Sequence, residues 1–146
     1  MDLAILAPGT TPASQQVSRL YESVGWSAYT GDLESLLAGL AGSRTLVTAF
    51  HQGELVGLAR IVGDGHTIAY LQDVLVSPTW QRKGLGSRLV RAAFAEHDGV
   101  RQQVLLTDLG PQQRAFYLSL GFAEVGTADV PLRCFVRFVN QPEITQ

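Results

Sequence analysis

A short segment in the middle of the chain, Gln81–Ser87, combines two glycines with two adjacent basic side chains. A buried strand is expected to end shortly before it, and a helix to begin within the glycine pair. The first amide groups of a helix have no partner inside the helix, and the helix dipole places about half a positive charge there. Gly84 and Gly86 would let a ligand approach the backbone closely. Arg82 and Lys83 would add full positive charge, so the segment predicts a site for an oxyanion such as pyrophosphate.

The same glycine pair also has a purely structural interpretation, a tight connection between a strand and a helix. A P-loop requires G-x-x-x-x-G-K-[ST], which the sequence lacks. A dinucleotide fingerprint requires a third glycine where Leu89 stands, and residues 77–83 separate the strand from Gly84 by too much. Two common phosphate motifs are therefore excluded, and the glycines alone leave loop geometry and anion binding as alternatives.

Composition and charge narrow the class of protein. A chain of 146 residues can bury a hydrophobic core, and we expect one domain over residues 1–146. A net charge of −2 without a basic stripe disfavours nucleic acid as a partner. No apolar run approaches the roughly 20 residues that span a bilayer, and no secretory signal is visible, so no membrane is predicted and a cytoplasmic protein is expected. Cys134 is the only cysteine and the histidines lack ligand spacing, so no metal site is predicted.

The elements that would position the glycine pair follow from hydrophobic periodicity and from glycine stops. Helices are predicted between Thr11 and Gly25, between Asp32 and Gly42, from Leu85 to Gly99, and over Pro111–Leu120. Strands are predicted over Leu3–Leu6, Thr45–Phe50, Leu55–Val62, Thr67–Val76, Gln103–Thr107, Phe122–Val125 and Arg133–Val139. This order predicts an α/β (α+β) fold with a mixed central sheet of about six to seven strands, flanked by about four helices.

Two blocks of the sequence, in this order, are similar to those of one family. The segment Gln81-Arg82-Lys83-Gly84-Leu85-Gly86 resembles the Q/R-x-x-G-x-G/A motif of the GNAT superfamily of N-acetyltransferases. Phe116–Phe122 resembles the F-Y-x-x-x-G-F segment of the same family. The resemblance covers about half of the chain, Leu55–Phe122, and implies a GNAT-like fold.

The resemblance implies transfer of an acetyl group from acetyl-coenzyme A to a primary amine of a small molecule by direct attack. The pantetheine arm would lie along Asp73–Val76, where family strands splay apart at a bulge, and the pyrophosphate would rest on the amides of the glycine pair. The residues expected to contact the coenzyme are Val74, Leu75, Val76, Gln81, Arg82, Lys83, Gly84, Leu85, Gly86 and Ser87. Two alternatives remain, a protein or peptide N-acetyltransferase and a non-catalytic acyl-coenzyme A-binding module.

Tyr117 is the candidate acid of the reaction that the resemblance implies. It matches the tyrosine of the family's F-Y pair, which lies near the sulfur of the coenzyme. A phenol titrates near 10, slightly above a thiol, so it can donate a proton to a departing thiolate. The alternative is a core tyrosine on an amphipathic helix.

Asp73 is the candidate base, or the anchor for an ammonium group. It alternates with Leu71 and Leu75 along an otherwise apolar strand. A carboxylate on such a surface is costly unless it faces a wet groove or has a partner. The alternative is therefore a structural aspartate that pairs with Arg60 on the neighbouring strand.

Two further regions carry expectations about the acceptor and about assembly. Trp26 and Tyr29 lie in the loop between the first two predicted helices, where the family builds its acceptor site, and aromatic walls suit an amine. The alternative is that these rings hold the loop against the core. Near the chain end, Cys134–Val139 alternates in polarity, which predicts strand pairing across a homodimer, an arrangement common in the family.

Overall fold

A computed structural model describes residues 4–9 and 11–139 of the chain. The chain divides into two compact units between Leu106 and Thr107. The first unit contains β1 (Ile5–Pro8), α1 (Ser14–Ser23), α2 (Ser27–Thr30), α3 (Leu33–Ala41), β2 (Thr45–His51), β3 (Glu54–Gly63), β4 (Ile68–Val76), the 3-10 helix η1 (Pro78–Trp80), α4 (Leu85–Ala95) and β5 (Gln102–Leu105). In the described part of the second unit, α5 (Pro111–Ser119) is the regular element.

The first unit is built on one mixed sheet in the order β1-β2-β3-β4-β5. The first four strands form an antiparallel meander, and β5 pairs with β4 in parallel. A mixed sheet with flanking helices was predicted, and this part is confirmed. The predicted edge strand Leu3–Leu6 corresponds to β1, although Leu3 lies outside the described residues.

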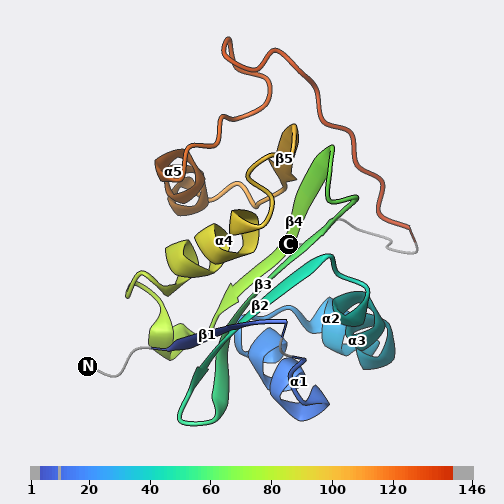
Figure 1. The fold of residues 1–146 in the computed structure, drawn as a ribbon, viewed down its shortest axis with the longest axis vertical. Coiled ribbons are helices and arrows are strands. Elements are labelled where there is room, and N and C mark those ends of the chain that lie inside the picture. The colour runs from blue at the N-terminus through green and yellow to red at the C-terminus, as the bar shows by residue number, and fades with distance from the viewer. Residues whose placement is uncertain (1–3, 10, 140–146) are drawn as a thin grey trace. The chain divides into compact units, whose positions relative to one another are not determined.

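Helices cover both faces of this sheet (Figure 1): α1, α2 and α3 lie on one side and α4 lies on the other. The core on the first side is formed by side chains of α1, α3 and three strands, namely Val17, Leu20, Tyr21, Leu36, Leu40, Leu46, Leu55, Leu58 and Leu75. On the other side, α4 packs close to β3 at Gly57. A Cβ at this glycine would lie 2.9 Å from Leu89 Cδ1 and 3.2 Å from Leu85 Cδ2. This close approach fixes α4 on the strand next to β4.

The number of strands differs from the prediction. The described residues form five strands rather than six to seven, because Phe122–Val125 and Arg133–Val139 contain no strand. Polar alternation suits a strand, but a strand also needs a neighbouring edge for its main-chain hydrogen bonds. The side chain of Phe135 is 88% exposed, so this alternation does not mark a buried face. The homodimer remains a prediction, without the strand on which it was based.

Among the described residues, five α-helices form where about four were predicted, since α2 lies inside the expected loop between Gly25 and Gly31. The predicted start of α3 after Asp32 is confirmed, and Asp32 caps the helix. Asp32 Oδ1 accepts a hydrogen bond from the Ser35 amide at 3.1 Å, and this bond satisfies one of the amides that the helix leaves unpaired.

Candidate active site

The edge of β4 that faces β5 is paired along only part of its length. Its pairing with β5 ends at Leu71, which lies opposite Leu105, whereas its pairing with β3 continues to Val76. The β3–β4 register shifts by one residue at this point, so Gln72 is an extra residue, a β-bulge. From the bulge to Val76, β4 therefore has an edge without a β5 partner among the described residues.

Main-chain groups along this edge alternate in direction. The Ser77 amide donates to the Val56 carbonyl at 2.8 Å. Because hydrogen-bonded pairs alternate along an antiparallel ladder, Leu75 also bonds to β3, while the N–H and C=O groups of Val74 and Val76 face the open edge. Gln81 Nε2 donates to the Val76 carbonyl at 3.0 Å, in agreement with this direction. The edge thus presents main-chain donors and acceptors to a ligand.

The segment Gln81–Ser87, here called the glycine turn, follows η1 and leads into α4. Arg82 and Gly84 both have left-handed backbone angles, with φ of 63° and 81°. The first helical bond of α4 runs from Arg88 to the Gly84 carbonyl at 3.2 Å, so the amides of residues 85–87 have no partner inside the helix. A Cβ at Gly84 would meet no atom within 4 Å, which leaves open space beside these amides. The geometry suits an oxyanion.

Lys83, the only lysine of the chain, is held at the same turn. Its Nζ lies 5.1 Å from the centre of the Trp80 ring, a cation–π contact. The Trp80 ring in turn packs 4.8 Å from the ring of His51 at the end of β2. The ammonium group is therefore positioned by an aromatic ring beside the glycine turn.

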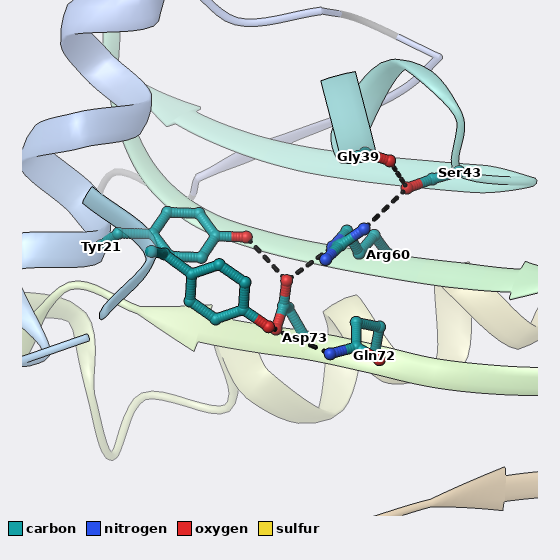
Figure 2. A network of polar contacts seen from close by, with 7 residues as sticks. Tyr21, Gly39, Ser43, Arg60, Gln72 and Asp73 are labelled. Carbon is teal, nitrogen blue, oxygen red and sulfur yellow. Dashed lines mark hydrogen bonds and ion pairs between the residues drawn. The ribbon is translucent and has the colours of Figure 1, made fainter. Parts of the chain in front are cut away.

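Asp73 lies at the centre of a buried polar cluster that α1, α2, β3 and β4 build together (Figure 2). Its Oδ2 accepts hydrogen bonds from Tyr21 Oη at 2.9 Å and from Arg60 Nε at 2.5 Å. Its Oδ1 accepts one from Tyr29 Oη at 3.0 Å, and Gln72 Nε2 donates to the same phenol oxygen at 3.0 Å. We call these five residues the Asp73 network. Its ion pair is the partnership with Arg60 that the sequence offered as an alternative.

The bulge decides which face of the sheet carries this carboxylate. Residues directly opposite each other in a sheet share a face, and Asp73 is opposite Arg60, whereas Leu71 is opposite Ile61. Arg60 and Ile61 are consecutive and point to opposite faces, so Asp73 and Leu71 do as well. From its alternation with Leu71, Asp73 was expected on the same face of the sheet as Leu71. This is wrong, because the extra residue shifts the alternation of side chains by one position.

Burial and charge act on the partners of Asp73. Burial, followed by the charge of Asp73, raises the pKa of Tyr21 far above its ordinary value of about 10. The same two causes raise the pKa of Tyr29. Burial alone would lower the pKa of Arg60, but the adjacent Asp73 carboxylate more than offsets this, so the pKa is raised. Arg60 therefore stays charged, and both phenols stay protonated, at neutral pH.

The two aromatic residues expected at the acceptor site lie beside this network. Trp26 and Tyr29 are 6.1 Å apart between ring centres, and Tyr21 packs edge-on against both. Trp26 remains 36% exposed. A cleft of about 270 Å³ adjoins Tyr29 and is lined by Ala28, Tyr29, Asp32, Ser35, Leu36 and Arg60. The rings hold α2 against α1 and also border open space, so the geometry is compatible with both predicted roles.

Tyr117 belongs to the second unit, on α5. Its ring packs edge-on against Phe116 and Phe122, at 4.9 and 6.0 Å between centres. Burial, followed by the charge of Asp108, raises its pKa above the ordinary value. The phenol is therefore protonated over the usual range of assay pH, as a proton donor must be.

Sequence reasoning missed two members of the Asp73 network as site residues. Tyr21 lies in the first predicted helix but was not among the candidate residues, although a buried tyrosine usually needs a partner for its hydroxyl group. The resemblance implied a bulge along Asp73–Val76, but nothing marked Gln72, the residue before this stretch, because the position of a bulge depends on pairing with the neighbouring strand.

The described residues hold neither a membrane-spanning helix nor a cluster of metal ligands. In residues 4–9 and 11–139, no helix is long and apolar enough to cross a membrane. Within the same residues, no three or more histidine, cysteine, aspartate or glutamate side chains gather as metal ligands.

Comparison with known proteins gives one family. A family model described as an acetyltransferase (GNAT) domain matches residues 42–124. An acetyltransferase of the GNAT family from Streptococcus pneumoniae is 29% identical, with 95% of this chain and 100% of that chain covered and a TM-score of 0.82.

Two more distant structures share the fold. A transcriptional regulator from Bacillus halodurans is 19% identical, with 91% of this chain and 99% of that chain covered and a TM-score of 0.68. AAC(6′)-Iy, solved in complex with the bisubstrate analogue CoA-S-monomethyl-acetylneamine, is 17% identical, with coverages of 94% and 99% and a TM-score of 0.63. At this identity, the likeness shows the fold alone.

Proposed function

Because the chain belongs to the GNAT acetyltransferase family, we propose that it transfers an acetyl group from acetyl-coenzyme A to a primary amine of a small molecule. One observation carries this proposal: β4 parts from β5 after Leu71 and leads through η1 into the glycine turn. The open edge offers hydrogen bonds to the amides of pantetheine, and the first turn of α4 offers amides to the pyrophosphate. The two sites follow the order of these groups along the coenzyme.

The coenzyme-binding residues then divide into three kinds. Val74 and Val76 would bind through main-chain groups. Leu75, between them on β4, would support this edge by pairing with β3 and by packing its side chain into the core. Gln81 would hold the end of the strand to the turn. The pyrophosphate would be bound by Arg82, Lys83, Gly84, Leu85, Gly86 and Ser87, through charge or through main-chain amides.

In the proposed reaction, the amine nitrogen forms a bond to the acetyl carbon and the bond from that carbon to sulfur breaks. The nitrogen loses one proton to water, and the thiolate gains one. We assign the donation to Tyr117, which matches the family's F-Y block and is protonated at neutral pH. We propose that Trp26 and Tyr29 border the acceptor. The bisubstrate analogue CoA-S-monomethyl-acetylneamine bound to AAC(6′)-Iy supports an acceptor of this class.

An assay of thiol release from acetyl-coenzyme A tests the proposal. We expect release to depend on a small primary amine, with benzylamine, tyramine and spermidine as probes. Release with an unblocked peptide but with none of these amines would favour the peptide N-acetyltransferase. Coenzyme binding without any release would indicate a non-catalytic module.

The role of Tyr117 has its own test. Tyr117→Phe removes the proton donor and should lower kcat by about 100-fold or more, with the KM for acetyl-coenzyme A nearly unchanged. Tyr70→Phe, on the paired part of β4, is the matched control and should retain the kcat of the wild type. An unchanged kcat in Tyr117→Phe would remove Tyr117 from the mechanism.

A further inference from the structure

Tyr29 and Gln72 present hydrogen-bond acceptors at the edge of the Asp73 network. A carboxylate can only accept, so the Tyr29 hydroxyl must donate its single proton to Asp73 Oδ1. The contact between Gln72 and the phenol oxygen must then use Nε2 as donor. This arrangement leaves Gln72 Oε1 available to accept a hydrogen bond from a ligand. The phenol oxygen of Tyr29 can also accept one more hydrogen bond.

Asp73 itself is out of reach of a substrate. Its side chain is 1% exposed, and its two oxygens accept three hydrogen bonds from Tyr21, Tyr29 and Arg60. Gln72, in contrast, is exposed, and Tyr29 is half-buried. The network therefore meets solvent mainly through neutral acceptors, while the Asp73 carboxylate stays inside and the nearly buried Arg60 only borders the cleft beside Tyr29.

These acceptors also lie at the point where the proposed coenzyme site begins. Gln72 is the bulge residue, next to Leu71, the last residue of β4 that pairs with β5. The open edge proposed for pantetheine starts immediately after it. An amine held by Gln72 is thus placed at one end of that edge.

We propose that Tyr29 Oη and Gln72 Oε1 together position the acceptor nitrogen, and that they select a neutral primary amine. Such an amine has two N–H groups and one lone pair. Two acceptors can hold the two hydrogens while the lone pair faces the thioester carbon. A neutral secondary amine has one N–H group and would leave one acceptor unpaired.

In this arrangement Asp73 is a positioning residue for Tyr29 and takes no proton. When the nitrogen bonds to the acetyl carbon and the carbon–sulfur bond breaks, one of the two nitrogen protons passes to water and the other remains on the amide. The thiolate receives its proton separately. The inference rests on the proposed N-acetyltransferase function.

The test compares benzylamine with N-methylbenzylamine in the full chain. Wild type should prefer the primary amine in kcat/KM by about tenfold, the effect of one lost hydrogen bond of roughly 1.4 kcal/mol. Gln72→Met and Tyr29→Phe should each raise the KM for benzylamine about tenfold and abolish most of this preference. The KM for acetyl-coenzyme A should stay unchanged in both variants.

Gln15→Met, an exposed glutamine on α1, is the matched control and should behave as wild type. Thermal unfolding of each variant shows whether it is folded. A purely structural network would lower stability without altering the ratio between the two amines, and that outcome would overturn the inference. Wild type without amine-dependent thiol release, with spermidine as a second primary amine, would instead overturn the proposed function itself.

Discussion

The Asp73 network lies where the open edge of β4 begins, the glycine turn follows the end of the same strand, and the two are built in different ways. The turn is expected to bind through main-chain amides, which every residue carries, and two left-handed residues shape it. The network consists of side chains, each of which has a defined partner. One region depends on backbone geometry, and the other depends on residue identity.

This difference has an energetic consequence. Because Arg60 and Asp73 are both buried, removal of one leaves a charge without a partner inside the protein. At the exposed turn, water fills the place of a removed basic side chain, so no charge is left buried without a partner. Side-chain substitutions should therefore affect folding at the network and ligand binding at the turn.

The largest effect is expected for Asp73→Ala. Loss of the carboxylate leaves the Arg60 guanidinium buried and unpaired, which should lower the free energy of unfolding by about 3–5 kcal/mol. Denaturant titration measures this loss. The double variant Arg60→Met/Asp73→Leu removes both charges and should be more stable than the single variant. Equal stability of Asp73→Ala and wild type would contradict the description of the network as a buried ion pair.

At the glycine turn, we expect a smaller change in the free energy of unfolding, and an increase instead of a loss. Arg82 has a left-handed φ of 63°, which costs roughly 1–2 kcal/mol for a residue with a Cβ. Arg82→Gly should therefore raise the free energy of unfolding by about 1 kcal/mol. Through the lost charge, it should also raise the KM for acetyl-coenzyme A several-fold, which corresponds to about 0.5–1 kcal/mol of binding free energy. Arg82→Ala loses the charge and keeps the strain, so it is the matched control. A more stable Arg82→Gly with unchanged KM would exclude Arg82 from coenzyme binding.

The smallest effect is a dependence of stability on alkaline pH. The pKa of Tyr21 is raised in the folded state, so the unfolded chain loses this proton first. The contribution of Tyr21 is complete below pH 10 and falls as the pH rises above it, by about 1 kcal/mol over the first pH unit. Denaturant titrations at pH 9 to 11 should show a steeper decline for wild type than for Tyr21→Phe. Parallel declines would show that this phenol is not coupled to folding.

Local signals predicted much of the fold. Glycine stops and the Asp32 cap gave the helices, and β-branched runs gave the meander from β2 to β4. The glycine turn could be predicted because its chemistry belongs to the backbone, which glycine spacing reports. The binding roles assigned to the site residues remain predictions.

Non-local features could not be predicted in the same way. Asp73 was expected to need a partner and Arg60 was named as one, but nothing in the sequence indicated that Tyr21 and Tyr29 also donate to this carboxylate. The segment Arg133–Val139 alternates like a strand, yet forms none, since alternation says nothing about an available edge. In both cases the deciding contact involves a residue far away in the chain.

The bulge at Gln72 also indicates how β4 would respond to a change in length. Deletion of Gln72 would make Leu71 and Asp73 consecutive, and consecutive residues of a regular strand point to opposite faces, as Ile61 and Arg60 opposite them already do. Both ladder pairs would therefore be kept without the bulge. The fold should accept this deletion as well as many side chains at position 72, whereas the hydrogen bond from Gln72 to Tyr29 would be lost.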